Sequence, residues 1–202
     1  MAIKKVVIFG ATGNTGLATV QSALNKGYEV TAFVRDPQKL PANIKPTHTV
    51  VGDATNRSDV DRALQGQEGV IVVLGTRNDL SATTALSDGT RNIVESMTAH
   101  NIQRIACCLS SFIFWERTKI PERILPVHTE HERMLEILKG SDRQWIAVCP
   151  PHIEDNPARG GYTLKLDGAV GRSITKYDLG DILVDSLTSD DKVGHLVGMG
   201  YA

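Results

Sequence analysis

The sequence predicts an α/β fold, in which a single doubly wound parallel sheet carries helices on both faces. Short apolar runs alternate with longer amphipathic segments along the whole chain of 202 residues, and this alternation is typical of strand–helix–strand units. The first apolar run ends at Gly10, and Gly13 and Gly16 follow at spacings of three. Aromatic residues make up only 5% of the chain, which suits the Val, Ile and Leu core of a parallel sheet.

The expected strands are the apolar runs, each followed by residues that end an extended segment. In chain order they are residues 3–9, 29–34, 47–51, 70–74, 103–109 and 144–149, with two shorter strands at residues 162–166 and 172–174. Pro150 and Pro151 stop the sixth strand, because proline cannot donate to a sheet ladder. Helices separate most of these strands, so right-handed crossovers should place them in one parallel sheet.

The expected helices carry apolar residues three and four positions apart, which gives each of them one buried face. In chain order they are residues 14–26, 56–64, 83–100, 127–139 and 175–187. Gly27 ends the first helix, Ser58 is expected to cap the second, and a capping box from Thr175 to Asp178 opens the last. A short tail is expected beyond it. No linker or repeat interrupts the pattern, so residues 1–202 are expected to form one domain.

The three glycines after the first strand predict a binding site for a dinucleotide. Gly10 permits an unusual φ in the turn, Gly13 leaves room for a phosphate near backbone N–H groups, and Gly16 lets the helix pack closely. The spacing is G-x-x-G-x-x-G and not the more familiar G-x-G-x-x-G. Its place between an apolar strand and a helix N-terminus is typical of a Rossmann-type sheet, in which ligands bind at the carboxyl ends of the strands.

Charged residues after the second strand indicate which dinucleotide is bound. Arg35 and Lys39 suit the 2′-phosphate of NADP, a dianion that needs charge-assisted donors. Asp36 leaves NAD open, because a carboxylate there would bind a ribose 2′-hydroxyl. After the third strand, Asp53 is in reach of the adenine or is simply a helix-capping carboxylate. Gly75 after the fourth strand allows close approach of the cofactor.

The ends of the fifth and sixth strands are where a substrate would meet the nicotinamide. Ser110 offers a hydroxyl that orients substrate or relays a proton. The chain lacks the Tyr-x-x-x-Lys pair that protonates a carbonyl oxygen in ordinary short-chain dehydrogenases. A conjugated hydride acceptor, such as a flavin or an extended tetrapyrrole, is therefore a better match. His152 either orients substrate, donates a proton or is a structural histidine.

The irregular segment after the fifth strand combines aromatic and basic residues. Phe112 and Trp115 offer flat apolar faces, and Lys119 and Arg123 offer cations. This mixture fits a planar ligand that bears carboxylates or a phosphate, although a packed loop with solvated charges has the same composition. The loop of about residues 110–126 and the C-terminal elements of about residues 150–202 are expected on the substrate side.

Composition excludes several classes of protein. A net charge of −1 and a pI of about 6.6 give no basic excess for nucleic acid. No apolar run is long enough for a signal-peptide core or a membrane span, so a cytoplasmic protein is expected. Cys107, Cys108 and Cys149 lie in apolar strands and are odd in number, which indicates buried reduced thiols. No Cys/His spacing is typical of a metal site.

The sequence resembles the family of NADPH-dependent flavin reductases and biliverdin reductases, which are atypical short-chain dehydrogenases/reductases. The resemblance covers nearly the whole chain and is carried by residues 9–17 (FGATGNTGL), 27–31 (GYEVT), 34–36 (VRD), 51–53 (VGD), 74–81 (LGTRNDLS) and 150–153 (PPHI). It implies a monomer that uses NADPH to reduce FMN, FAD, riboflavin and biliverdin isomers, the IXβ form above all, as in haem catabolism. Flavin is then a substrate and not a prosthetic group.

Roles for individual residues follow from the strand ends and from the resemblance together. The expected cofactor contacts are Gly10, Thr12, Gly13, Asn14, Thr15, Arg35, Lys39, Asp53, Ala54, Leu74, Gly75, Leu86, Cys108 and Pro151. The expected catalytic residues are Ser110 and His152, which also line the substrate site with Phe112, Trp115, Lys119, Arg123 and His131. Lys39 stands where the family usually has arginine, which should loosen the hold on the 2′-phosphate.

Two further points bear on function. Asn14 stands where the family usually has glutamine. Cys108 corresponds to a family cysteine linked to haem-nitrosyl transfer. The family has a second such cysteine near the final helix, which has no counterpart in this chain. The competing hypothesis is a non-catalytic NADP-binding regulator that senses redox state and binds a partner protein. Such a protein would keep the glycine turn and lose the active-site residues, whereas Ser110 and His152 are both present.

Overall fold

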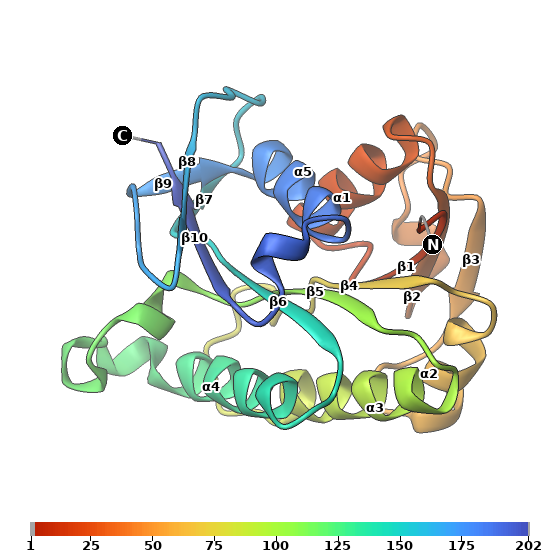
Figure 1. The fold of residues 1–202 in the computed structure, drawn as a ribbon, viewed down its shortest axis with the longest axis horizontal. Helices are drawn as coiled ribbons and strands as arrows, with labels where there is room; N and C mark the ends of the chain where they lie inside the picture. Colours follow the sequence, from red (N-terminus) through yellow and green to blue (C-terminus); the bar gives the residue numbers. More distant parts are fainter. Residues whose placement is uncertain (1–2, 202) are drawn as a thin grey trace.

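The computed structural model describes residues 3–201, in which an eight-stranded sheet runs through the molecule (Figure 1). Its strands are β1 (Lys5–Phe9), β2 (Glu29–Val34), β3 (His48–Val51), β4 (Gly69–Val72), β5 (Arg104–Cys108), β6 (Gln144–Cys149), β8 (Thr163–Leu166) and β10 (Leu196–Gly200). Their order is β3-β2-β1-β4-β5-β6-β10-β8. Neighbouring strands pair in parallel, except that β8 is antiparallel to β10. A separate parallel pair joins β7 (His152–Glu154) to β9 (Ser173–Thr175).

Helices cover both faces of the large sheet (Figure 1). On one face lie α1 (Asn14–Asn25) and α5 (Lys176–Ser186), and on the other lie α2 (Arg57–Leu64), α3 (Ala85–Ala99) and α4 (Leu125–Lys139). Between β5 and α4 the chain makes short 3₁₀ turns at Ser111–Phe114, Arg117–Lys119 and Glu122–Ile124. The predicted doubly wound α/β fold is therefore confirmed, with an antiparallel edge strand added.

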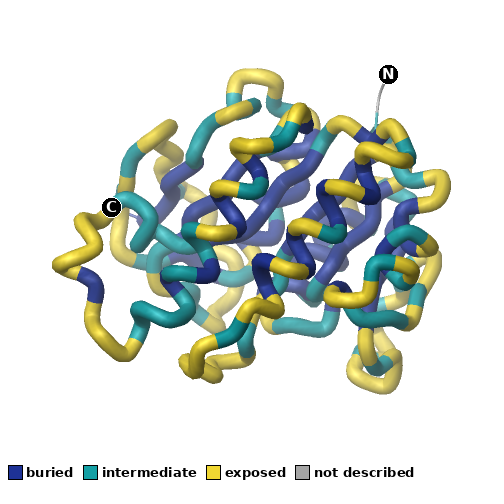
Figure 2. Tube along the Cα trace, turned by 90° about the horizontal axis from the view of Figure 1, so that it is seen from below, coloured by how far each residue is buried: buried dark blue, intermediate teal, exposed yellow. Residues whose placement is uncertain are grey.

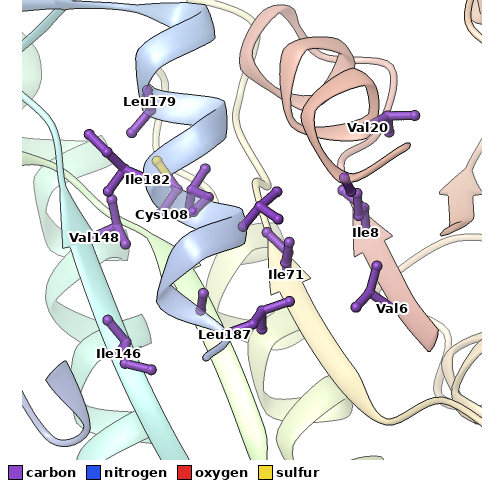
Figure 3. Packing of buried hydrophobic residues seen from close by; sticks show 14 of the residues in the cluster. Val6, Ile8, Val20, Ile71, Cys108, Ile146, Val148, Leu179, Ile182 and Leu187 are labelled. Atoms are coloured by element: carbon purple, nitrogen blue, oxygen red, sulfur yellow. The ribbon is translucent and has the colours of Figure 1, made fainter. Parts of the chain in front are cut away.

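Two apolar clusters, one on each face of the sheet, form the core. The cluster beneath α1 and α5 includes Ile8 and Ile71 of the sheet and Leu179 of α5 (Figure 3). Beneath α2, α3 and α4 the cluster includes Phe9 and Met134. Figure 2, seen from that side, shows the buried trace along the central strands and exposed outer turns on the helices. Because helices cover both faces, the central strands are buried almost throughout, which explains their continuous apolar sequences.

The remaining expected strands and helices are present, with ends shifted by at most two residues, but the cap of α2 differs. The side chain of Asn56, and not that of Ser58, caps α2. Its Oδ1 accepts hydrogen bonds from the backbone N–H groups of Ser58 at 3.0 Å and Asp59 at 3.4 Å. The amide is placed before the first turn, where it satisfies two donors that have no intrahelical acceptor.

The expected C-terminal tail is also wrong, because it contains β10, an interior strand of the sheet. The two glycines in its sequence, LVGMG, lower its strand propensity, so the sequence pattern does not predict a strand there. A side chain cannot fit there: a Cβ on Gly198 would lie 2.0 Å from the carbonyl oxygen of Gly168. The short strand β7 was not expected either. The predicted domain of residues 1–202 includes residues 1, 2 and 202, which lie outside the described residues.

Candidate functional site

Parallel register brings the predicted strand-end residues to one edge of the sheet. Phe9, the last residue of β1, pairs with Phe33 of β2 and Val72 of β4. Cys108 at the end of β5 pairs with Val148 of β6. The segments that follow these strands therefore share the carboxyl edge. They carry Gly10, Arg35, Asp53, Gly75, Ser110 and Pro151.

The turn after β1 requires glycine at two of its three glycine positions. Gly10 has a φ of +83°, and a Cβ there would lie 2.2 Å from the carbonyl oxygen of Val73. A Cβ on Gly16 would lie 2.1 Å from the carbonyl oxygen of Gly10. The predicted roles of Gly10 in the turn and Gly16 in close packing are confirmed. The phosphate-binding role of Gly13 stays a prediction.

The N-terminus of α1 is left without a side-chain cap. Gly13 is the N-cap residue, and the first intrahelical bond runs from the Leu17 N–H to the Gly13 carbonyl oxygen at 2.9 Å. The N–H groups of Asn14 and Thr15 therefore have no acceptor within the helix. No acidic residue lies in the first turn, so the positive end of the helix dipole is not neutralised there. These features fit a pyrophosphate group.

The N-terminus of α3 differs, because the protein itself supplies an anion. Glu130 of α4 is fully buried, and its Oε2 accepts hydrogen bonds from the backbone N–H groups of Leu86 at 3.0 Å and Ser87 at 2.9 Å. Its Oε1 accepts from Arg133 at 3.0 Å and from the Ser87 hydroxyl at 2.9 Å. Sequence analysis missed Glu130, since nothing in the pattern links it to a helix 44 residues away.

The residues around the glycine turn include a basic side chain that was not predicted. Nη2 of Arg77 donates to Oγ1 of Thr12 at 3.4 Å. Arg77 and Asn78 both have positive φ, at 54° and 68°, which bends this segment back over the turn. The available signal was the stretch 74–81, which carries part of the family resemblance but drew attention only to Leu74 and Gly75.

The ends of β2 and β3 bring Arg35 near Asp53. The pKa of the Asp53 carboxyl is lowered mainly by hydrogen bonds from the Thr55 N–H at 2.9 Å and the Thr55 hydroxyl at 2.8 Å, with a smaller contribution from Arg35. Since Asn56 caps α2, the interpretation of Asp53 as a helix-capping carboxylate is wrong. Asp53 remains an expected contact of the adenosine end.

Asp36 has a local structural partner at the end of β2. Its Oδ1 accepts from the Gln38 N–H at 3.0 Å and so caps the 3₁₀ turn Pro37–Lys39. Its other carboxylate oxygen lies 3.9 Å from Nζ of Lys39. Arg35 is exposed at the strand end, where its guanidinium can meet a ligand. A guanidinium in this position is able to form charge-assisted hydrogen bonds to a phosphate.

The wall between β4 and α3 is closely packed around Gly89, which sequence analysis missed. A Cβ on Gly89 would lie 3.0 Å from Cδ1 of Leu74 and 3.1 Å from Cβ of Ala54. The carbonyl oxygen of Ala54 accepts from Asn92 at 2.9 Å. Leu74 and Ala54 are thus fixed beside the carboxyl edge. Leu86, by contrast, is only 4% exposed and lies in the apolar cluster.

Ser110 and His152 follow neighbouring strands. The Ser110 hydroxyl oxygen accepts from the Phe112 N–H at 3.3 Å and caps the turn Ser111–Phe114. The Ser111 N–H donates to the carbonyl oxygen of Pro150 at 2.8 Å, which ties the two strand ends together. His152 begins β7 and is exposed, with its backbone N–H bonded to the Arg172 carbonyl oxygen at 3.3 Å.

The predicted aromatic and basic side chains divide into two groups. Phe112 and Trp115 form an edge-to-face pair with ring centroids 5.1 Å apart, and Trp115 is 48% exposed. Lys119 and Arg123 lie in the most exposed part of the segment, where Nζ of Lys119 is 3.1 Å from Glu116. Arg117, which was not predicted, holds the segment to α4 through Glu132 and through a 3.0 Å hydrogen bond to Thr129.

Two predicted residues lie deeper than the edge of the sheet. Burial, aided by the neighbouring His128, lowers the pKa of the partly buried His131 on α4 from 6.5 to about 4. Cys108 is 8% exposed, and its side chain lies among the apolar residues beneath α5 (Figure 3). Burial raises the pKa of its thiol to about 12. All three cysteines are buried and free, so the expectation of reduced thiols is confirmed.

Two hollows are lined by α4 and the elements beside it. A cavity of about 410 Å³ lies between α4 and the segment after β5, lined by Trp115, His128 and Glu132 among others. A groove of about 760 Å³ follows α3 and α4. Neither is lined by Ser110 or His152. Within residues 3–201, no cluster of His, Cys, Asp and Glu is suited to a metal ion, and no helix is long and apolar enough to cross a membrane.

Comparison with known proteins agrees with this geometry. A candidate NAD-dependent epimerase/dehydratase from Bacillus halodurans superimposes with a TM-score of 0.88 at 17% identity, over 98% of this chain and 94% of that one. A short-chain dehydrogenase/reductase from Veillonella parvula, solved in complex with NADP, gives 0.79 at 16% identity, over 98% and 95%. At these identities the likeness concerns the fold alone.

A sequence relative and a family model add to this likeness. A 3-beta-hydroxysteroid dehydrogenase from Mycolicibacterium neoaurum is 30% identical over 120 residues, which is 54% of this chain but only 32% of that protein. The chain thus matches about a third of the length of this relative. The model of the NAD(P)H-binding family matches residues 10–190, from the first glycine of the turn to beyond α5. The chain therefore belongs to the NAD(P)H-binding family.

Proposed function

We propose that the chain is an NADPH-dependent reductase of flavins (FMN, FAD and riboflavin) and of IXβ-type biliverdin. NADPH supplies the hydride when bound, and the flavin or bilin is a substrate that leaves after reduction. The observation that carries the proposal is the hydrogen bond from the Ser111 N–H to the Pro150 carbonyl oxygen, which ties together the strand ends that carry Ser110 and His152. Trp115, which is 48% exposed, lies five residues after Ser110. A hydroxyl, an imidazole and an aromatic face suit a planar acceptor that needs orientation more than acid catalysis.

The proposed cofactor, NADPH, is supported at two positions, one for the pyrophosphate and one for the 2′-phosphate. The uncapped N-terminus of α1 supports binding of the pyrophosphate. At the other position, the exposed Arg35 offers a guanidinium to a 2′-phosphate, while Asp36 accepts a hydrogen bond from the Gln38 N–H and caps the turn after β2. We therefore propose NADPH in preference to NADH.

The choice of hydride acceptor rests on the absence of a Tyr-x-x-x-Lys pair, whose tyrosine would protonate a carbonyl oxygen. None of the tyrosines is followed by a lysine four residues later. The Tyr201 hydroxyl is used inside the protein, where it bonds to Asp178 and Thr175. A carbonyl substrate would lack the usual proton donor, whereas an extended conjugated acceptor spreads the incoming charge and takes its proton from water or His152. In this proposal Ser110 orients the acceptor, and Lys119 and Arg123 meet its acidic groups.

The setting of the enzyme is part of the proposal. From the family resemblance we propose a monomer that acts on small planar molecules. The net charge of −1 supports a protein that binds no nucleic acid, and the buried free thiols suit the cytoplasm. The loop of about residues 110–126 and the elements of about residues 150–202 would form the substrate side of a single domain.

Steady-state oxidation of NADPH in the presence of FMN or biliverdin IXβ tests the proposal. We expect turnover well above the uncatalysed rate, with a lower kcat in Ser110→Ala and little change in NADP⁺ affinity. Ser58→Ala is the matched control. Ser58 is an exposed serine at the start of α2, and its hydroxyl hydrogen-bonds to the side chain of Asn56. Tight NADP⁺ binding combined with inertness toward every flavin and bilin would instead favour a redox-sensing regulator and would refute the reductase.

A further inference from the structure

The first turn of α5 meets the cofactor turn through one lysine. Nζ of Lys176, the first residue of α5, donates to Oδ1 of Asn14 at 3.1 Å, and Asn14 is the first residue of α1. The same ammonium group forms an ion pair with Asp155, which follows β7. The side chain of Lys176 is only 16% exposed. A cation is therefore held beside the uncapped helix N-terminus without belonging to the glycine turn.

The packing of α1 against α5 fixes this contact. The two helices lie side by side on one face of the sheet (Figure 1). A Cβ on Gly180 would lie 2.9 Å from the carbonyl carbon of Ala18, so the backbones approach closely only because residue 180 is glycine. The Ser22 hydroxyl also hydrogen-bonds to Asp181 across the helix pair. The backbone of Lys176 is consequently held at a fixed distance from the N-terminus of α1.

The start of α5 is anchored just as firmly to the C-terminal part of the chain. Asp178 is 3% exposed and accepts hydrogen bonds from the Arg159 N–H at 2.9 Å and the Thr175 hydroxyl at 2.9 Å, as well as from the Tyr201 hydroxyl. The start of α5 is thus fixed, and the ammonium group of Lys176 is held there by Asn14 and Asp155. The hydrogen bond to Asp155 raises the pKa of Lys176, which keeps it protonated.

We propose that Lys176 is a further cofactor-binding residue, which supplies a positive charge to the pyrophosphate of the bound dinucleotide, and that Asp155 competes for this charge. The proposal rests on the cofactor half of the proposed function. Because NAD and NADP share the pyrophosphate, Lys176 should contribute equally to both. Arg35, which faces the 2′-phosphate in that proposal, should contribute to NADP alone.

Calorimetric titration with NADP⁺ and with NAD⁺ tests this assignment without turnover. We expect Lys176→Met to lower the affinity for both dinucleotides about three- to tenfold, by loss of one nearby charge, and less at high salt. Asp155→Asn should raise both affinities about two- to threefold, since it removes the competing carboxylate. Lys176→Arg keeps the charge and should recover most of the loss. Thermal unfolding of each variant establishes that it is folded.

The matched control is Lys26→Met. Lys26 also joins α1 to α5, through Asp185 at 2.5 Å and Asp181 at 3.8 Å, but it lies at the opposite end of α1 from the glycine turn. We expect its removal to leave both affinities unchanged. Equal affinities in Lys176→Met and the wild type, a loss confined to NADP⁺, or an equal loss in Lys26→Met would each overturn the inference. A wild-type protein that binds neither dinucleotide would instead refute the cofactor half of the proposed function.

Discussion

The buried carboxylate at the start of α3 allows a stability prediction that can be worked out from individual contacts. In Glu130→Ala, the N–H groups of Leu86 and Ser87 lose their acceptor. The Ser87 hydroxyl keeps a partner, because it also donates to the Thr84 carbonyl oxygen at 3.1 Å. Two orphaned buried donors cost roughly 1–3 kcal/mol each. Loss of the carboxylate from the positive end of the helix dipole adds about 0.3–1 kcal/mol.

Two effects reduce this sum. The mutation removes a fully buried charge, and Arg133, the ion-pair partner that it leaves behind, is 51% exposed and can be solvated by water. We therefore expect Glu130→Ala to lower the free energy of unfolding by about 3 kcal/mol, which for a chain of this size is a fall of roughly 6–12 °C in Tm. Glu130→Gln, which retains one acceptor oxygen, should cost about 1 kcal/mol.

Urea unfolding followed by circular dichroism measures these changes, with the slope m expected to stay constant. Glu136→Ala is the control, because Glu136 is an exposed carboxylate on the same helix, and its loss should stay within about 0.5 kcal/mol. A loss below about 1 kcal/mol in Glu130→Ala would refute the reasoning. It would mean that water replaces the carboxylate without penalty.

Three further predictions concern the cofactor, pH and the thiols. Arg35→Ala should weaken NADPH binding about 10- to 100-fold, from the loss of charge-assisted bonds to a 2′-phosphate, and leave NADH binding unchanged; wild-type protein with equal affinities for both would contradict this. The folded-state pKa of His131 is depressed from 6.5 to about 4, so the unfolded chain binds its proton first as the pH falls. Stability should therefore decrease between pH 6.5 and 4, and His131→Asn should flatten that slope in urea titrations across the range; an unchanged slope would count against the burial argument. Burial raises the pKa of Cys108 to about 12. A thiol reagent at pH 8 should therefore label Cys108 no faster than the protein unfolds. Rapid labelling of the wild-type protein that is absent in Cys108→Ser would contradict this prediction.

Local patterns predict most of the fold, because they are written in neighbouring residues. The glycines at positions 10, 13 and 16, the apolar runs and the helical stripes each involve fewer than about 20 residues of chain. The structure places these strands and helices within two residues of expectation. The exceptions are informative. β10 was missed because Gly198 and Gly200 obscure its pattern, although their lack of side chains is what allows residues 168–171 to pack against the strand.

The sequence by itself determined the doubly wound sheet, the turn for a dinucleotide and the strand ends at which a ligand site lies. Parallel strands share one carboxyl edge, so knowing where each strand ends is enough to list Arg35, Ser110 and His152 as candidates for a site at that edge. Tertiary structure alone decided which charges occupy that edge. Glu130 fills the N-terminus of α3, while Lys176 meets the N-terminus of α1 from 162 residues away. Contacts between residues so far apart in the sequence depend on how the helices pack, so no local sequence motif predicts them.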